Sequence, residues 1–465
     1  MNQANGRKLK VVFASVTAGG GHNSIRDMIY EQFINDDRFE VVKFDHPRKL
    51  NNNSIFLNSP KFYDAVFKSV PHEVISLFTI SLLDACYEMI EREKPDIVIS
   101  SHTLLTCHIK LLQQGFNYKF ETIYAIPDYG PVAPAIFPNI KYTRPERIIV
   151  LEEKTKNDII KTIKMPKEDI FVVGHQARSD FRESDKKYGN KENAKIALKD
   201  LLEQKGIRFD ITKPTILIAG GAGDIIEDAT SFIKTIIKEQ KNNPELLNRQ
   251  YIIICGYNSK FHSEISDIIF KNRVTNIFPL GWINSQEFSL IQYATDFPIL
   301  FSIGPGTFIE LVTSKCGPLV IYRSKGGQEI PNREYAVSNG LGIYSPKTSD
   351  VIKRIKKLFS EEEYKVFANN ADSLLARNIL KNRSLKAWVL KEYSSNESLE
   401  NKKFDIENLK ISYKIKNKWL VPLTLVGLAI TLISSVLLFF VSKSSKPILK
   451  SKTKIKRSIE RYQKK

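Results

Sequence analysis

The sequence predicts an α/β fold of two doubly wound, Rossmann-like domains that face a common cleft, followed by a C-terminal transmembrane helix. Three observations carry this prediction. Short β-branched runs alternate with longer helical stretches twice along the chain, glycine-rich turns follow several of those runs, and one uncharged apolar segment lies near the end. Alternating strands and helices build a parallel sheet covered on both faces, and ligands collect at the carboxyl ends of its strands.

The first domain is predicted to span residues 8–178. Helical stretches such as Ser24–Ile34 and Glu73–Glu91 separate several of its expected strands. Those strands are Lys10–Val16, Glu40–Phe44, Asp96–Ser100, Thr122–Ile126, Glu146–Val150 and Ile170–Val173.

A hydrophilic stretch at residues 179–192 interrupts the apolar pattern, which predicts a linker. The pattern then restarts over residues 193–393, the predicted second domain. Its expected strands are Thr215–Ala219, Tyr251–Cys255, Asn276–Leu280, Phe297–Leu300 and Pro318–Tyr322. Two such domains in succession leave a cleft that the carboxyl ends of both sheets face.

The C-terminal region predicts a membrane anchor. Residues 394–418 form a polar tether, and residues 419–442 contain no charged side chain over 24 positions. At about 1.5 Å per residue such a helix is roughly 35 Å long, enough to cross a hydrocarbon core of about 30 Å. Residues 443–465 form a basic tail with ten Lys and Arg residues and one acid, Glu460, hence a net charge of +9.

The orientation of this anchor is open at the sequence level. The stronger positive charge follows the span, which favours a cytoplasmic tail. The chain starts with a polar segment and no secretory signal, which favours a large part that folds in the cytosol. A re-entrant or interfacial segment with both ends in the cytosol satisfies both arguments. We therefore expect a membrane protein with its catalytic domains in the cytosol.

Charge and cysteine content narrow the class of protein. The chain of 465 residues has a formal net charge of +19, which suits nucleic acid or an anionic membrane surface, and the adjoining apolar span favours the membrane over nucleic acid. Its four cysteines show neither CxxC spacing nor clustering, which fits a reducing compartment and argues against a thiolate metal site.

The glycine-rich turn directly behind the first strand predicts a reactive site. The run Gly19-Gly20-Gly21-His22-Asn23 lets backbone N–H groups approach a ligand at the start of a helix. Histidine is the side chain able to accept a proton near neutral pH. Strand, glycines and histidine together indicate group transfer, with a purely structural turn as the alternative.

The second half carries further glycine loops at its strand ends. They are Ala219–Gly223, Cys255–Asn258, Gly304–Glu310 and Gly326–Asn332. Small residues and helix N-termini suit a nucleotide diphosphate, since N–H groups and the helix dipole meet phosphate charge without a metal. The chain has no Walker-type GxxxxGK[ST] motif, so the lysine that an ATPase would need is missing. The first βα unit also has no GxGxxG motif followed by an acid that could bind a ribose.

Taken in order, the motifs GGGHNS, GPGT with a following Glu, GGQE and a final N…NG.G resemble the monogalactosyldiacylglycerol synthase family. That family includes processive diacylglycerol glucosyltransferases and is more distantly similar to the N-acetylglucosaminyltransferase of the peptidoglycan lipid intermediate. The resemblance covers roughly residues 9–390. It implies a GT-B fold with the acceptor in the first domain and the donor in the second, and an inverting, metal-independent transfer from a UDP-sugar to a lipid hydroxyl.

Carried over by position, the resemblance implies two catalytic residues. His22 would remove the proton of the acceptor hydroxyl as that oxygen attacks the anomeric carbon. Asp128 would orient His22 or share the role of base, and a helix or turn cap is its structural alternative. Gly20, Gly21 and Asn23 would form the acceptor-side loop.

The resemblance also implies a donor site that needs no cofactor and no metal, with UDP-glucose or UDP-galactose as the substrate. Glycine loops would line the diphosphate, Glu310 would lie near the ribose, and the Gly326–Asn332 segment would bind the sugar. The implied donor residues are Gly220, Gly221, Gly223, Gly256, Gly304, Gly306, Thr307, Glu310, Gln328, Glu329 and Asn332. Ordinary loop and capping roles are the alternative for this set.

Some positions depart from the family pattern. Ser302 and Ile303 stand where the family often has a basic residue, so one phosphate contact is either missing or supplied elsewhere, by Arg323 or Lys325. His22 is followed by Asn23 and not by Arg or Lys, and the tryptophan that often follows the Asp128 segment is missing. These departures leave the substrate preference, and activity itself, open.

Three further features have two interpretations each. The segment Ser59–Lys68 fits a membrane-docking flap or, preferably, a core-facing helix. The trio His102, Cys107 and His108 lacks a further clustered ligand, so a zinc site is disfavoured. Trp282 is either core or a wall beside the uracil.

The sequence therefore predicts a membrane-anchored transferase that moves a hexose from a UDP-sugar to diacylglycerol. Two alternatives stay open: transfer to a polyprenyl or other amphipathic acceptor, and a membrane protein that binds a UDP-sugar without catalysis.

Overall fold

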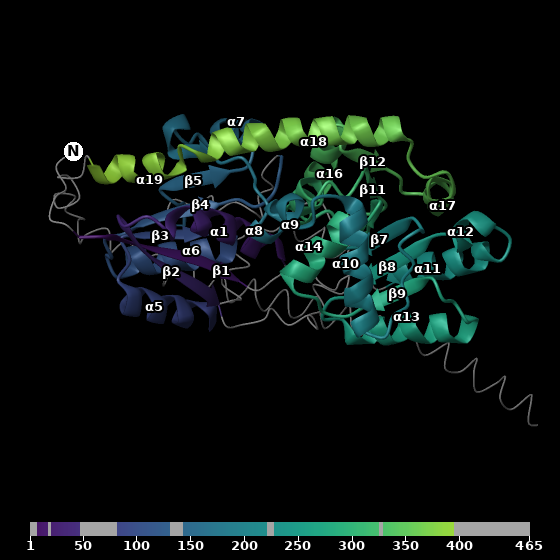
Figure 1. Cartoon of the computed structure of the whole chain (residues 1–465). Helices are drawn as coiled ribbons and strands as arrows, with labels where there is room; N and C mark the ends of the chain where they lie inside the picture. The colour runs from purple at the N-terminus through teal and green to yellow at the C-terminus, as the bar shows by residue number, and fades with distance from the viewer. Residues whose placement is uncertain are drawn as a thin grey trace, which may run out of the picture. The chain divides into compact units, whose positions relative to one another are not determined.

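The computed structural model describes residues 7–16, 20–46, 81–130, 143–220, 227–324 and 329–394, all of which belong to one compact unit (Figure 1). Within them lie two parallel six-stranded sheets, as the strand rhythm predicts. The segment at 59–68, a flap or preferably a core-facing helix, and the predicted membrane span at 419–442 lie outside these residues. Across the described ranges, no helix combines the length and apolarity that a membrane crossing requires.

The first sheet has the strand order β2-β1-β3-β4-β5-β6. Its strands are β1 (Leu9–Val16), β2 (Phe39–His46), β3 (Ile97–Ser100), β4 (Glu121–Ala125), β5 (Arg147–Val150) and β6 (Ile170–Val172). The helices between them are α1 (Gly20–Phe33), α5 (Ser81–Glu93), α6 (Thr103–Gly115) and α7 (Glu153–Ile163), with the short η1 (Lys167–Asp169) before β6.

Alternation along β1 explains how both faces of this sheet are covered. Val11 and Phe13 share a buried cluster with Ile25 and Ile29 of α1. The residues between them, such as Val12, pack in another cluster with residues of α5 and α6. Because successive side chains of a strand point to opposite faces, an uninterrupted apolar strand needs helices on both sides.

The second sheet has the order β12-β11-β10-β7-β8-β9. Its strands are β7 (Thr215–Ala219), β8 (Gln250–Ile254), β9 (Ile277–Leu280), β10 (Phe297–Leu300), β11 (Leu319–Ile321) and β12 (Gly342–Tyr344). The sequence analysis missed β12, which has only three residues, of which two are exposed. A short strand of this kind carries too few apolar positions to show a period.

Helices complete the second half of the unit (Figure 1). They are α10 (Lys191–Gln204), α11 (Glu227–Gln240), α12 (Pro244–Leu247), α13 (Ser259–Asn272), α14 (Ser285–Ala294), α15 (Pro305–Thr313), α16 (Glu329–Ser338), α17 (Thr348–Lys357), α18 (Glu361–Asn382) and α19 (Leu385–Ser394).

The segment predicted as a linker at 179–192 is helical instead. It forms α8 (Ser179–Arg182), α9 (Ser184–Tyr188) and the start of α10. Phe181 is buried and contacts Phe288 of α14 edge-on, with ring centroids 6.1 Å apart. Tyr188 also contacts the ring of Tyr293, whose hydroxyl donates to Asp185 at 2.6 Å, so several contacts with α14 hold the segment.

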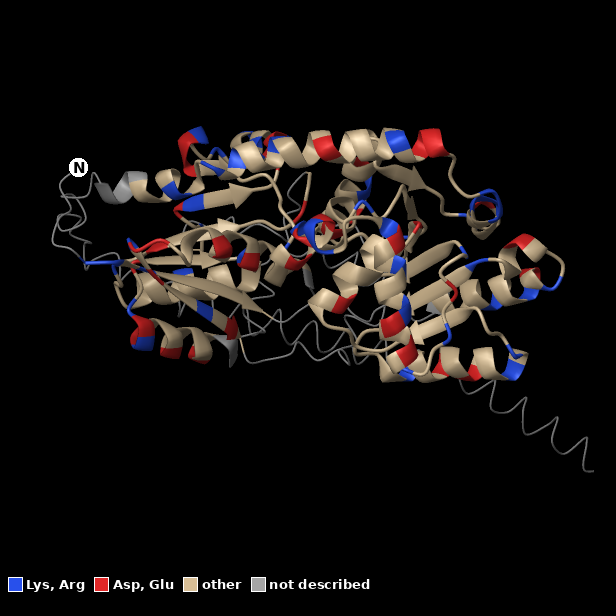
Figure 2. Cartoon of the chain, viewed as in Figure 1, with Lys and Arg blue, Asp and Glu red and all other residues tan. Residues whose placement is uncertain are grey.

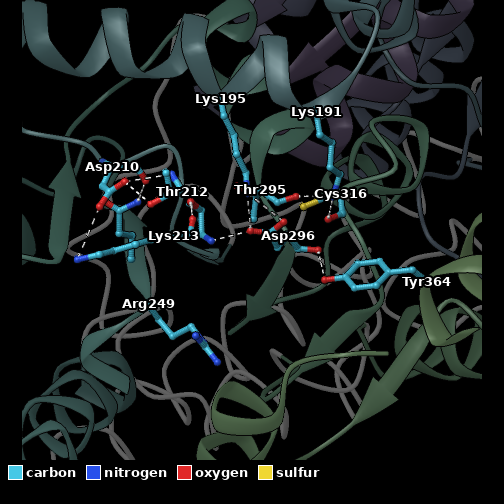
Figure 3. A network of polar contacts seen from close by, with 12 residues as sticks. Lys191, Lys195, Asp210, Thr212, Lys213, Arg249, Thr295, Asp296, Cys316 and Tyr364 are labelled. Atoms are coloured by element: carbon cyan, nitrogen blue, oxygen red, sulfur yellow. Dashed lines mark hydrogen bonds and ion pairs between the residues drawn. The ribbon is translucent and has the colours of Figure 1, made fainter. Parts of the chain in front are cut away.

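A polar network fastens α10 to the amino edge of the second sheet (Figure 3). The Lys191 ammonium donates to the carbonyls of Thr295 and Cys316, at 2.8 and 3.2 Å. Lys195 pairs with Asp296, whose carboxylate also accepts from the backbone N–H of Thr215 at 2.7 Å. This network lies at the amino end of β7 and β10, so it supports the fold at the edge opposite the glycine loops.

The last two helices return to the first sheet. Trp388 of α19 donates its indole N–H to the carbonyl of Glu168, and the guanidinium of Arg147 lies 4.5 Å from its ring. Lys386 pairs with Asp36 at 2.9 Å. Residues near the end of the predicted second domain therefore pack on the first sheet. Basic and acidic side chains are intermixed along the described helices (Figure 2).

Candidate active site

The carboxyl edge of the first sheet carries a titratable side chain at or just after the end of every strand. In strand order along the chain they are His22, His46, His102, Asp128, Glu152 and His175. The strands are parallel, so these residues come to one edge of the sheet, where open α/β folds bind their ligands.

His22 lies in the first turn of α1, because the helix begins at Gly20 and not at the predicted Ser24. The ring is half-buried, and its Nδ1 lies 2.7 Å from the carbonyl oxygen of Ser101. A carbonyl only accepts, so in the neutral ring Nδ1 carries the proton and Nε2 is the basic nitrogen. Burial lowers the pKa of His22, and the bond to Ser101 opposes that shift. The ring is therefore neutral at physiological pH, as a general base requires.

The carbonyl of Ser101, and not Asp128, holds the His22 ring. Ser101 follows β3, and the next residue, His102, is the N-cap of α6. The rings of His22 and His102 lie with centroids 4.6 Å apart. From the sequence, His102 is considered only as a disfavoured metal ligand; the signal that could have found it is its place two residues after the end of β3. Among the described residues, no group of three or more His, Cys, Asp and Glu side chains is arranged to hold a metal.

Asp128 follows β4 and bonds to the second half of the molecule. Its Oδ1 accepts from the side-chain amide of Asn332 at 3.1 Å, and burial raises its pKa to about 6, although the Asn332 bond opposes that shift. The next residue, Tyr129, stacks on Tyr335 of α16 with ring centroids 4.1 Å apart. The segment that carries Asp128 is thus packed against α16.

Gly130 allows the closest approach in this contact. Its φ is +84°, and a Cβ there would lie 2.4 Å from the Cβ of Pro331. Its N–H donates to the Glu152 carboxylate and to the Thr155 hydroxyl, both at 2.9 Å. Any larger residue would push the Asp128 segment away from α16.

In the second half, α15 begins inside the predicted phosphate loop, Gly304–Glu310. Gly304 is the N-cap, Pro305 is the first helical residue, and Thr307 is half-buried. N–H groups in the first turn of a helix have no partner within the helix, and the dipole adds partial positive charge there. This geometry suits a phosphate group.

The first turns of α1 and α15 touch. A Cβ on Gly21 would lie 3.6 Å from the ring of Pro305, and a Cβ on Gly306 would lie 2.9 Å from the Cβ of Ser24. The glycines of both motifs therefore serve close helix contact. This contact brings the helix that carries His22 beside the positive end of α15.

Glu310, predicted near the ribose, lies on α15 in an ion pair with Arg178. The Nε–Oε1 distance is 2.8 Å, and the Glu310 side chain is 4% exposed whereas that of Arg178 is 34% exposed. Burial raises the pKa of Glu310, and the charge of Arg178 opposes that rise. Arg178 precedes α8, so this pair joins the segment between the sheets to α15.

Glu329 and Asn332, predicted to bind the sugar, lie at the start of α16 and bond to the loop between β10 and α15. Glu329 accepts from the Ser302 hydroxyl and from the N–H of Ile303, the latter at 3.0 Å. Asn332 donates to the carbonyl of Ile303 at 3.1 Å. These bonds set the conformation of the loop that leads into Gly304.

The remaining predicted residues divide into described and undescribed ones. Gly220 follows β7, Gly256 adopts a φ of +58° ahead of α13, and Asn23 accepts from the Ser15 hydroxyl at 2.7 Å. Arg323, expected to contact phosphate, donates to the carbonyls of Pro346 and Tyr322. Lying outside the described residues are Gly221, Gly223, Lys325 and Gln328.

Trp282 is not a core residue. It is 59% exposed and stacks on Tyr257, which is 67% exposed, with ring centroids 4.0 Å apart and planes 12° from parallel. Tyr257 follows β8 and Trp282 follows β9, so the pair stands at the carboxyl edge of the second sheet. Of the two interpretations of Trp282, the core is wrong and the wall beside the uracil stays a prediction.

Comparisons with known proteins agree with this architecture. No model of a known protein family matches the chain. This chain is 24% identical over 367 residues to a processive diacylglycerol beta-glucosyltransferase of Staphylococcus epidermidis. The match covers 76% of this chain and 85% of that protein. It is also 24% identical to a probable chloroplastic monogalactosyldiacylglycerol synthase of rice, covering 77% of this chain and 69% of that protein.

Solved structures show the same fold at low identity. A UDP-N-acetylglucosamine 2-epimerase matches with a TM-score of 0.52 at 15% identity, over 84% of this chain and 98% of that one. A complex of S. aureus MnaA with UDP matches with a TM-score of 0.50 at 13% identity, over 81% and 98%. The chain thus has a GT-B-like fold of two Rossmann-like domains, and its relatives are the diacylglycerol glycosyltransferases that its motifs resemble.

Proposed function

We propose that the protein is an inverting glycosyltransferase that moves a hexose from a UDP-sugar to the hydroxyl of diacylglycerol. The observation that carries this proposal is the contact between α1 and α15, which sets a neutral histidine beside a helix N-terminus. A base and a site for leaving-group charge, side by side, are what a sugar transfer needs. The names of the relatives support the choice of donor and acceptor.

In the proposed reaction the acceptor oxygen attacks the anomeric carbon of the donor. The new C–O bond forms as the bond between that carbon and the UDP oxygen breaks, and UDP leaves with the electron pair. The proton of the acceptor hydroxyl passes to Nε2 of His22. The negative charge that grows on UDP is stabilised by N–H groups and the dipole at the start of α15, so we propose that no metal is required.

The proposed location is the cytosolic face of a membrane. The uncharged segment 419–442 and the basic tail 443–465 would anchor the chain and attract anionic lipid. An anchor of this kind keeps the cleft near the leaflet that holds a lipid acceptor.

Two measurements test this location. The full chain should stay with membranes in alkaline carbonate, and protease added to sealed cells should not reach the large domains. Release of the chain by carbonate would contradict the anchor.

Product analysis tests the function. Membranes that contain the full chain are incubated with diacylglycerol and either UDP-glucose or UDP-galactose, and lipids are separated and weighed by mass spectrometry. We expect a hexosyl-diacylglycerol from at least one donor. Product only with a polyprenyl acceptor would favour the second acceptor class. UDP binding without any glycolipid would favour a non-catalytic binder.

A further inference from the structure

Asn332 makes contacts that its predicted role as a sugar ligand does not explain. Its Nδ2 donates to Oδ1 of Asp128 and to the carbonyl of Ile303, each at 3.1 Å, and its Oδ1 accepts from the N–H of Tyr129 at 2.9 Å. The residue is 0% exposed. Both N–H donors and the carbonyl oxygen of the amide are therefore engaged inside the protein.

These three bonds join segments that meet at the site. Asp128 and Tyr129 follow β4 of the first sheet, and Ile303 precedes the N-cap of the donor helix α15. Asn332 lies on α16, one residue after Pro331, which touches Gly130. One side chain thus ties the Asp128 carboxylate to the loop that leads into Gly304.

The surrounding contacts make this tie stiff. Tyr129 stacks on Tyr335 one turn further along α16, and its hydroxyl lies 3.1 Å from Nδ1 of the buried His175. Glu329, one turn before Asn332, holds the same loop through Ser302 and Ile303. A network whose members are each held by others keeps its groups in place to within a few tenths of an ångström.

We propose that Asn332 is a positioning residue for the transfer reaction. Its amide orients the Asp128 carboxylate and fixes the position of this carboxylate relative to the donor loop at Ile303. The acceptor side and the donor side are therefore aligned only when the two halves are in contact. This proposal rests on the proposed function. It replaces direct sugar binding by Asn332 with action through Asp128.

Asn378 provides a matched control. It is an asparagine with 4% exposure, and its Nδ2 donates to the carbonyl of His175 at 2.7 Å, so it too joins a C-terminal helix to the first half. Its bond is to the backbone carbonyl of His175, whereas Tyr129 contacts the His175 ring, so Asn378→Ala leaves all three bonds of the Asn332 side chain in place. Asn332→Ala and Asn378→Ala therefore remove the same atoms from similarly buried bridges.

The experiment is a double-mutant cycle with Asp128→Ala, read as kcat and as KM for the UDP-sugar, with melting temperature measured for every variant. We expect Asn332→Ala to lower kcat by roughly 10- to 100-fold while KM changes by less than about threefold, since a misplaced group near the reacting atoms mainly affects the chemical step. In the Asp128→Ala background, Asn332→Ala should lower kcat no more than Asn378→Ala does.

Four results would overturn the proposal. The first is an equal loss of kcat in Asn332→Ala and Asn378→Ala, and the second is that the kcat losses of Asn332→Ala and Asp128→Ala add up in the double mutant. The third is that Asn332→Ala raises KM for the UDP-sugar and leaves kcat unchanged, as a direct sugar ligand would. The fourth is that the wild type transfers no sugar to any acceptor. The last one removes the proposed function as well, whereas the first three leave it intact. Should Asn332→Ala fail to fold, Asn332→Asp replaces it, because it keeps the shape and the acceptor for the Tyr129 N–H but loses both donors.

Discussion

The carboxyl edges of the two sheets differ in the residues that they carry. The first edge ends in titratable side chains, with His22, His102 and Asp128 following the neighbouring strands β1, β3 and β4. The second edge presents glycines and the start of α15, and two acids close to it, Glu310 and Glu329, are bonded to Arg178 and to the 302–303 loop. In the proposed function, proton transfer and charge stabilisation belong to different halves, so we expect that each can be removed without the other.

The strongest test of this division is His22→Ala. Loss of a general base lowers the rate by roughly 10²- to 10⁴-fold, while UDP affinity should stay within about threefold because the donor half is unchanged. His262→Ala, on α13, is the control and should keep full activity. The rate comes from glycolipid formation and the affinity from calorimetry with UDP. A variant with the turnover of the wild type would show that His22 is not the base.

Arg178→Met tests whether Glu310 is structural. It leaves a buried carboxylate without its partner, and we expect a loss of about 2 kcal/mol in the free energy of unfolding, below the usual range for a fully buried pair because Arg178 is one-third exposed. The double variant Arg178→Met with Glu310→Met should recover most of the lost free energy of unfolding. Urea unfolding measures this free energy for the single and the double variant.

Glu310→Gln sharpens the same point, since UDP affinity is read alongside stability. Unchanged affinity would place Glu310 among the structural acids. Affinity lost without loss of stability would support the predicted ribose contact and weaken the division between the two edges.

Gly306→Ala tests the contact between the two helices. A Cβ at this position would lie 2.9 Å from Ser24, whereas a Cβ at Gly304 would meet no atom within 4 Å. We expect Gly306→Ala to cost about 1 to 3 kcal/mol through overpacking and to slow transfer, and Ser24→Gly in the same chain to relieve it. Gly304→Ala should leave the melting temperature unchanged; equal losses in both variants would show that the helices do not touch.

The smallest expected effect is in the pH dependence. His22 works as a base only when neutral, and burial lowers its pKa, so its acid limb lies below the usual value of 6.5. Burial raises the pKa of Asp128 to about 6, so that this carboxyl gains a proton as pH falls through about 6. We expect kcat/KM to rise with pH and to reach a plateau near pH 7. In Asp128→Asn only His22 still titrates, so the rise in kcat/KM should occur at lower pH. An unmoved limb would exclude Asp128 from the rate.

Much of the fold was predictable because its signal is local. Eleven of the twelve described strands lie where β-branched runs predict them, within one or two residues at each end. The twelfth, β12, is too short and too exposed to show a pattern. The supposed linker at 179–192 has a hydrophilic composition, and the few residues that pack, such as Phe181, were too sparse to reveal its helices.

The site was predictable only in part. His22 is predictable because a strand and glycines precede it. The place of His102 beside His22 is not predictable, because the two residues are 80 positions apart in the chain, and the sequence therefore suggests His102 only as a disfavoured zinc ligand. The partners of Asp128 and Asn332 could not be assigned, since these residues lie 204 positions apart. No periodicity or spacing connects two such positions.

By itself, the sequence determined the two parallel sheets, the helices around them, the glycine turns at their carboxyl edges and an apolar segment near the C-terminus. Each of these follows from the chemistry of adjacent residues, which strand and helix periods report directly. Only the tertiary structure decided which group each side chain meets: Ser101 for His22, Asn332 for Asp128, Arg178 for Glu310, Ser24 for Gly306. The physical reason is that a hydrogen bond or a close contact depends on how two distant segments pack, and many distant pairs are compatible with the same local pattern.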